Sequence, residues 1–266
     1  SSLAPALAGL ALFCSLPLAA QTGGAVSLPA VTVNSTGVAN QEPAGTFAMP
    51  ASALTYEPRV DLQARSQPEG QADIAIRGGT FENTGIRLGA LPLFDPQTGH
   101  YLAEIPVAPA MLGAPSILTG ADNAVLGWNA DAGTVAYAWR PIRSSGFVTA
   151  GGGQYGSEQG ELYLGDVGEA RIGGRRLAAD VDVAHASSDG SVADGDSRFD
   201  RADVRLQLAD SAAQTDLVYG YQAKFFGWPN LYTPFNSDET ENLETVLLAL
   251  NHRRQFAAGD FLEYGA

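Results

Sequence analysis

From residue 146 onward, apolar and polar residues alternate along the chain in a series of segments. The segment 202–208 alternates without error, and in 214–225 Val218 is the one exception. Successive side chains of a strand point to opposite faces, so this period of two predicts strands with one apolar and one polar face. The predicted strands are 147–155, 160–172, 176–187, 199–209, 214–225, 241–255 and one from 260 onward.

The lengths of these strands and of their connections favour an antiparallel transmembrane β-barrel. Strands of about 10 residues cross a bilayer when they are tilted. The connections 173–175, 210–213 and 257–259 are short, whereas 188–198 and 226–240 are long. Short turns on one side of the membrane and long loops on the other are typical of outer-membrane barrels, and a soluble sandwich has no reason for that asymmetry.

Aromatic residues cluster where the fifth strand would leave the membrane, at Phe225, Phe226, Trp228 and Tyr232. Such a cluster is typical of the interfacial girdle of a barrel. Seven strands do not close a barrel wide enough to hold a further domain, and open strand edges are not stable in lipid. We therefore expect residues 146–266 to be the first strands of an incomplete barrel, so that the chain is a fragment.

Residues 42–145 have a different pattern and predict a small α+β domain that precedes the barrel strands. The motif Arg77-Gly78-Gly79 ends one strand in a turn that glycine tolerates best. The run Asp95-Pro-Gln-Thr-Gly99 has strong turn chemistry. The short strands predicted here are 73–77, 85–88, 116–119 and 134–139.

The first residues predict a targeting segment followed by a flexible arm. Residues 1–20 carry no charge, are rich in Leu and Ala and end in small residues, which is typical of a secretory signal peptide. The apolar run between Pro5 and Pro17 is too short to span a membrane. Cys14 is expected to be removed with this segment. Residues 21–41 are small and polar without a helical period and predict a flexible arm.

The composition and the motifs exclude several classes of function. The formal net charge is −14, whereas nucleic-acid binding requires a basic surface. The three histidines, His100, His185 and His252, lie in separate segments. They lack the spacing of paired zinc ligands. The glycine-rich run 151–156 precedes a predicted strand instead of the helix that dinucleotide binding requires. No nucleophile–base pair stands out, so we expect the protein not to be an enzyme.

The segment 70–141 resembles the plug domain of TonB-dependent outer-membrane receptors, in which a small domain sits inside a large barrel. The resemblance is carried by Arg77-Gly78-Gly79, by Arg87, by Gly120 and by the run 133–141. The runs 88–92, 115–120 and 132–137 depart from the sequences that are usual in the family. The runs 95–100 and 226–230 lean toward the cobalamin-receptor-like branch.

The resemblance implies energy-coupled import of a scarce nutrient, such as cobalamin or a metal chelate, across the outer membrane of a Gram-negative bacterium. The partners would be the TonB energy-transducing complex of the inner membrane, a small nutrient ligand and outer-membrane lipid, without nucleic acid. The run Ala30, Val31, Thr32, Val33 and Asn34 is the candidate TonB box, whose backbone would pair with the edge of a partner's sheet. From its residues alone, this run also fits an ordinary linker.

The resemblance further implies how individual residues act. Arg77 and Arg87 would pair with carboxylates on the barrel wall through charge-assisted hydrogen bonds. We expect no cofactor, with calcium at Asp189, Asp194 and Asp196 as an open possibility and a solvated loop as the ordinary interpretation. The candidate ligand contacts are Thr80, Phe81, Asn83, Asp95, Gln97, His100 and Tyr101.

Two other functions stay open on the sequence. One is a secreted, soluble β-sheet protein that binds carbohydrate or surfaces, which would need strands that form a closed core in water. The other is a passive porin-like channel, which would have no use for a plug or a TonB box.

Overall fold

The computed structural model describes residues 37–38, 48–65, 70–94, 104–230, 235, 237–257 and 259–266. All of them belong to one unit, Thr36–Ala266. The predicted signal peptide, most of the predicted arm and the candidate TonB box lie outside the described residues. The same holds for Asp95, Gln97, His100 and Tyr101.

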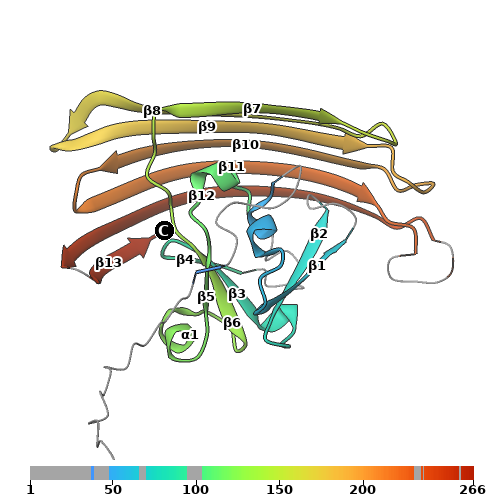
Figure 1. Ribbon diagram of the computed structural model, residues 1–266, viewed down its shortest axis with the longest axis horizontal. Helices are drawn as coiled ribbons and strands as arrows, with labels where there is room; N and C mark the ends of the chain where they lie inside the picture. The colour runs from blue at the N-terminus through green and yellow to red at the C-terminus, as the bar shows by residue number, and fades with distance from the viewer. Residues whose placement is uncertain are drawn as a thin grey trace, which may run out of the picture. The chain divides into compact units, whose positions relative to one another are not determined.

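The described residues up to 142, here called the compact domain, contain two small sheets, one short α-helix and 3₁₀ helices at Pro50–Leu54, Phe81–Asn83 and Pro109–Met111 (Figure 1). The four-stranded sheet has the order β4-β3-β6-β5, in which β3 and β6 are parallel and the outer pairs are antiparallel. A hairpin of β1 and β2 forms the second sheet, and α1 follows β5. The bounds are β1 Val60–Arg65, β2 Gln71–Ile76, β3 Thr84–Leu88, β4 Leu91–Leu93, β5 Ser116–Leu118, α1 Ala121–Leu126 and β6 Gly133–Tyr137.

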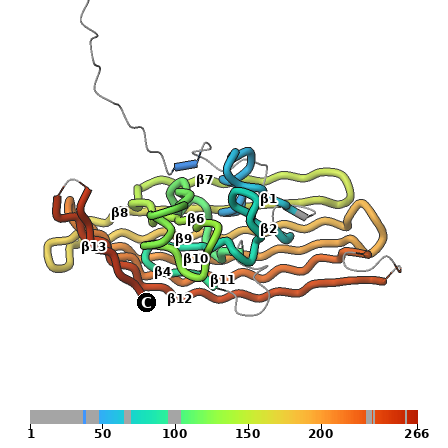
Figure 2. Tube along the Cα trace, turned by 90° about the horizontal axis from the view of Figure 1, so that it is seen from below, coloured from blue at the N-terminus to red at the C-terminus, as the bar shows by residue number. Residues whose placement is uncertain are grey.

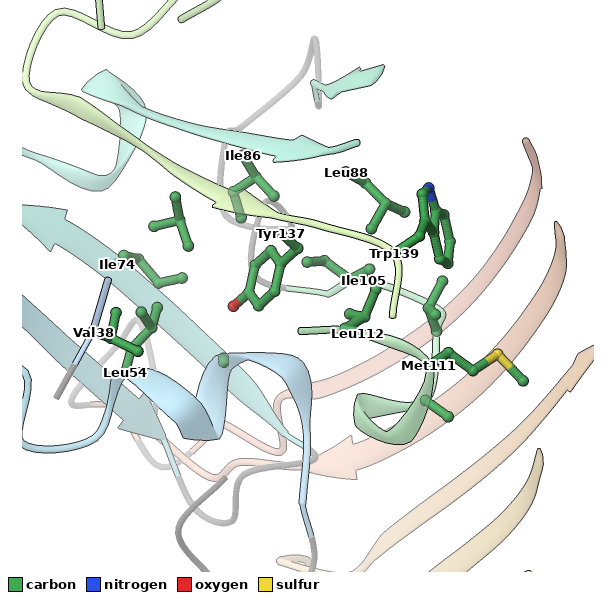
Figure 3. Packing of buried hydrophobic residues seen from close by; sticks show 14 of the residues in the cluster. Val38, Leu54, Ile74, Ile86, Leu88, Ile105, Met111, Leu112, Tyr137 and Trp139 are labelled. Atoms are coloured by element: carbon green, nitrogen blue, oxygen red, sulfur yellow. The ribbon is translucent and has the colours of Figure 1, made fainter. Parts of the chain in front are cut away.

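The compact domain has an apolar core between its sheets. Ile86, Leu88 and Val135 on the central strands are at most 2% exposed. Figure 3 shows their neighbours, among them Tyr137 and Trp139, converging from several segments. The Tyr137 hydroxyl donates a 2.9 Å hydrogen bond to the Pro50 carbonyl, so the polar end of this buried ring is satisfied. The predicted mixture of short strands and helix is confirmed, with β1 and β4 as strands that the sequence did not predict.

Residues 145–265 form one antiparallel sheet, here called the long sheet, in which strands neighbouring in sequence are neighbours in space (Figures 1 and 2). Its order is β13-β12-β11-β10-β9-β8-β7. The bounds are β7 Ser145–Gly152, β8 Glu158–Ile172, β9 Arg175–Ser188, β10 Ser197–Ala209, β11 Ala213–Gly227, β12 Thr240–Ala257 and β13 Asp260–Gly265.

The five central strands of the long sheet are longer than the sequence predicts. They run from 13 residues in β10 to 18 residues in β12. Backbone pairing does not depend on side-chain polarity, so the ladder continues past the segments where apolar residues alternate. The predicted alternation of short and long connections is confirmed, because β8 ends at Ile172 and β9 begins at Arg175, whereas β9 ends at Ser188 and β10 begins at Ser197. Gly173 and Gly174 make that short turn with φ values of +59° and +83°, which favour glycine.

Among the residues that the structure describes, no helix has the length and apolarity needed to cross a membrane.

Candidate functional site

The long sheet buries its polar face and exposes its apolar face. On β10, Arg201, Asp203 and Arg205 are at most 2% exposed, whereas the alternating residues Val204 and Leu206 are 47% and 46% exposed. Water-facing antiparallel sheets have the opposite arrangement, with apolar side chains toward the core. The sequence predicts both faces, and the structure identifies the polar one as the inner one.

The exposed apolar side chains form a continuous belt across neighbouring strands. The pairing register places Val181 of β9 opposite Val204, Val204 opposite Tyr219 of β11, and Tyr219 opposite Leu248 of β12. Leu248 is 71% exposed. An apolar belt that covers several strands is far larger than the isolated apolar residues of an ordinary soluble surface.

The inner face contacts the compact domain, and Arg205 is central to this contact. Its guanidinium donates to both carboxylate oxygens of Asp180, at 3.0 and 2.6 Å, and lies 3.6 Å from Asp216. The same side chain donates to the carbonyls of Met111 and Arg140, at 3.2 and 2.8 Å. It is completely buried, so the carboxylates and carbonyls replace the water that a guanidinium would otherwise bind.

Other inner side chains also bind the backbone of the compact domain. Asp203 accepts a 2.7 Å hydrogen bond from the Ala108 amide, and Gln207 accepts a 3.0 Å hydrogen bond from the Ile142 amide. Gly220 allows a close approach on β11, because a Cβ atom there would lie 2.0 Å from the Pro106 carbonyl oxygen. Main-chain groups have the same chemistry at every residue, so these contacts fix the position of the backbone without specifying its sequence.

Arg201 forms a second buried charge cluster near the middle of β10. It donates to Asp182 at 2.9 and 3.0 Å and to Glu161 of β8 at 2.8 Å. Arg201 also contacts the compact domain, but over a longer distance: its guanidinium lies 3.9 Å from the Met49 sulfur. This cluster therefore stabilises the inner face itself more than the contact with the compact domain.

Lys224 of β11 links the inner face to two separate segments of the compact domain. Its ammonium lies 3.0 Å from a Glu104 carboxylate oxygen and donates a 2.7 Å hydrogen bond to the Gly70 carbonyl. Burial raises the pKa of the Glu104 carboxyl to about 7, although the Lys224 charge lowers it. Lys224 is the only lysine of the chain.

The arginines of the predicted plug motif lie in different surroundings. Arg87 donates to the Gly89 carbonyl at 2.6 Å and lies 3.9 Å from the carboxylate of Glu263 on β13. Arg77 is exposed at the end of β2, with φ of 51°, and forms no ion pair with any residue that the structure describes. The structure therefore brings one of the two arginines within reach of a carboxylate on the long sheet.

The motif glycines occupy positions where a side chain is unfavourable. Gly78 and Gly120 have φ values of +77° and +61°, which favour glycine. A Cβ atom on Gly79 would lie 2.6 Å from that of Ala132. These glycines allow the turns of the compact domain in which they lie.

The candidate ligand contacts are only partly described. Thr80 and Asn83 are exposed and Phe81 is half-buried, all three at a 3₁₀ turn over Phe81–Asn83. Separately, a hollow of about 460 Å³ lies among the loops that join the long strands, and it is lined in part by Tyr155, Ser188 and Trp228.

Asp189, Asp194 and Asp196 are exposed in the connection between β9 and β10. Within the described part of the chain, no three His, Cys, Asp or Glu side chains lie close enough together to hold a metal ion. Calcium binding at these three residues therefore stays a prediction.

Sequence reasoning did not single out the inner residues Arg201, Arg205 and Lys224. Each lies at a polar position of the alternating pattern in a correctly predicted strand. Charged residues at positions that alternate with apolar ones were the available signal, but their partners lie far away in the sequence.

No protein-family model matches the chain, and no curated protein matches it. Solved structures do match in fold. The ferripyoverdine receptor of the outer membrane of Pseudomonas aeruginosa matches with a TM-score of 0.55 at 12% identity, over 77% of this chain and 29% of the receptor. The ferric yersiniabactin uptake receptor from Yersinia pestis matches with 0.55 at 13% identity, over 78% of this chain and 36% of the receptor.

A copper transporter matches with a TM-score of 0.56 at 16% identity, over 77% of this chain and 32% of the transporter. This chain therefore spans about a third of the length of these structures. At such identities the likeness concerns the fold, which combines a small domain with one stretch of a large antiparallel sheet.

Proposed function

We propose that the chain is part of a TonB-dependent receptor in the outer membrane of a Gram-negative bacterium. The observation that carries the proposal is the inverted polarity of the long sheet. A belt of apolar side chains faces outward, while buried charges face a compact domain. Hydrocarbon outside and a filled lumen inside require this arrangement.

In this proposal the compact domain is the plug, and the protein imports a nutrient without chemical change. Ligand binds from the side of the long loops, near the hollow beside Trp228 and the exposed turn at Thr80. The TonB complex pulls on the arm that contains Ala30–Asn34 and thereby opens a path past the plug. The cargo is a scarce nutrient such as a metal chelate or cobalamin. The names of the matched structures support iron–siderophore complexes and copper as classes of cargo, and none of them names cobalamin.

The two alternatives fit the structure less well. A soluble sheet protein would expose Val204, Tyr219 and Leu248 to water across neighbouring strands, at a large cost in hydration free energy. A passive channel has no use for a compact domain that is bound to its inner face by Arg205, Asp203 and Lys224.

Membrane insertion is tested by a spin label on β12 and a control label in a loop, in a Cys14→Ser background. Leu248 of β12 is 71% exposed on the outer face. In lipid vesicles, a label at Leu248→Cys should collide with dissolved oxygen, which concentrates in hydrocarbon, more often than with a water-soluble nickel chelate. The exposed control Val192→Cys, in the connection between β9 and β10, should show the reverse. Preferential collision with nickel at Leu248 would identify a water-facing sheet and refute the proposal.

Energy coupling is tested by cellular accumulation of radiolabelled ferric siderophore, copper or cobalamin. Proline cannot donate a ladder hydrogen bond, so Val31→Pro should abolish accumulation if 30–34 pairs with a partner's strand. Val26→Pro, in the same arm but outside the run, is the matched control. Accumulation that persists in Val31→Pro cells would contradict the assignment of the TonB box.

A further inference from the structure

On the outer face of the long sheet, polar side chains border the apolar belt at the end where the strands are joined by short turns. Thr215 of β11 pairs with His252 of β12, and His252 pairs with Tyr264 of β13. The Thr215 hydroxyl lies 2.7 Å from His252 Nδ1, and the rings of His252 and Tyr264 are 5.1 Å apart. Two residues closer to the turn, the Arg254 guanidinium lies 5.5 Å from the centre of the Phe256 ring.

Arg254 provides a positive charge that is available to a partner. It is exposed, and it forms no ion pair with the residues that the structure describes. Arg175, farther along the same edge, is already paired with Asp210 at 3.4 Å. Asp260, the first residue of β13, forms no ion pair with Arg254 among the residues that the structure describes.

The opposite end of the same face is neutralised or acidic. Arg198 and His185 both contact Asp200, each at 2.8 Å. The register places Ala223 beside Asp200 and Glu244 beside Ala223, so a further carboxylate extends this row. On the outer face, the end near Arg254 is therefore the more favourable one for a negatively charged partner.

The apolar belt continues directly from the polar border. Leu250 of β12 and Leu217 of β11 are 44% and 45% exposed. They pair with each other on the side of His252 and Thr215 that faces away from the short turns. A molecule with a charged head and apolar chains would place its head near Arg254 and its chains along these leucines.

We infer that the edge formed by His252, Arg254 and Tyr264 binds the headgroup of an anionic phospholipid on the side of the short turns. The inference rests on the proposed function, because it requires the outer face to contact lipid. The phosphate accepts hydrogen bonds from the Arg254 guanidinium and the Tyr264 hydroxyl, which are diagonal neighbours across the β12–β13 ladder.

The test is native mass spectrometry of the protein in detergent micelles, supplied with dioleoyl phosphatidylglycerol or with dioleoyl phosphatidylcholine. The wild type should retain the anionic lipid in preference to the zwitterionic one. An arginine near an anionic lipid surface contributes about 1 kcal/mol, so Arg254→Gln should lower retention of phosphatidylglycerol about fivefold. Tyr264→Phe, which removes only a hydroxyl, should lower it to a smaller extent.

Arg198→Gln is the matched control, because Arg198 lies on the same face at the opposite end and is paired with Asp200. It should leave retention unchanged. Equal retention of both lipids, or equal retention by wild type and Arg254→Gln, would overturn the inference. Displacement of the lipid by inorganic phosphate at matched ionic strength would also overturn it, because the site would then recognise the anion alone.

The spin label at Leu248 separates this inference from the proposed function. If that label reports contact with hydrocarbon while lipid selectivity is absent, only the headgroup site fails. If it reports contact with water, the proposed function fails as well.

Discussion

The compact domain and the long sheet bury opposite kinds of side chain. In the compact domain, Val135 and Leu88 are completely buried, as in any water-soluble core. In the long sheet, Arg205 and Asp216 are completely buried while Leu248 is 71% exposed. Both regions are made of strands, so secondary structure alone does not determine which side chains face inward. The medium on the outer side does, and the difference between the regions indicates two different media.

The first and largest effect should come from placing a charge in the apolar core. Val135→Asp buries a carboxylate on β6 without a partner and should cost more than about 5 kcal/mol of unfolding free energy. Urea unfolding, followed by tryptophan fluorescence, measures this cost. Val125 on α1 is 80% exposed, so the control Val125→Asp should stay within about 0.5 kcal/mol of the wild type. Equal costs for the two variants would show that the compact domain lacks the core described here.

In the long sheet, the severe change should be the removal of a charge. Arg205→Leu leaves Asp180 without its bidentate partner and removes one donor from each of the carbonyls of Met111 and Arg140. Breaking a buried ion pair in this way should cost about 3–5 kcal/mol of unfolding free energy. The double variant Arg205→Leu/Asp180→Leu should recover part of the loss, since neither charge is then left alone.

The control for Arg205 is Arg198 on the same strand, whose side chain is 68% exposed. Arg198→Leu should cost less than about 1 kcal/mol, because exposed ion pairs contribute little. If Arg205→Leu proves equally mild, the inner face is not the buried contact that the structure indicates.

The contact between the two regions should depend on pH through Glu104. Its pKa is raised from 4.5 to about 7 by burial, so the folded state binds this proton more tightly than the unfolded state. The resulting stabilisation is fully present below pH 4.5 and is lost as the pH rises through 7. Glu104→Gln should remove this pH dependence, which amounts to a change on the order of 3 kcal/mol.

The measurement for Glu104 is a series of urea titrations between pH 4.5 and 8. Glu82→Gln, at an exposed position of the same domain, should leave the profile of the wild type intact. A Glu104→Gln profile parallel to that of the wild type would show that this carboxyl titrates as it does in the unfolded chain.

The sequence predicts the strands well because apolar and polar residues alternate with a period of two within each strand. The segment 202–208 alternates without error, and β10 covers it. Alternation is the same for an apolar-in sandwich and an apolar-out barrel, however, so it does not identify the buried face. The unequal lengths of the connections favoured the barrel, and the burial of Arg205 agrees with that interpretation.

The contacts between the regions could not be predicted from the sequence. Arg205 donates to the carbonyl of Met111, which is 94 residues away, and a main-chain acceptor leaves no mark in the sequence. The pairing of Glu104 with Lys224 could not be predicted either, because residues 104–108 form no strand and have no alternating pattern. Of the two motif arginines, only Arg87 comes within 4 Å of a carboxylate on the long sheet in the described residues. The position of the Arg77 guanidinium depends on the direction of its side chain at the end of β2. The sequence motif does not predict that direction.

The smallest expected effect tests the outer face directly. Val204 is 47% exposed at the middle of the apolar belt, and Val204→Arg should cost about 2 kcal/mol of unfolding free energy in lipid vesicles. This value is at the low end for a lipid-facing arginine, because the long side chain can extend its guanidinium toward the nearer end of the strand. Ala223→Arg is the matched control on the same face, where the register places Asp200 and Glu244 on either side. It should cost nothing measurable. If both variants are equally stable in vesicles, the belt does not face hydrocarbon, and the contrast between the two regions needs another cause.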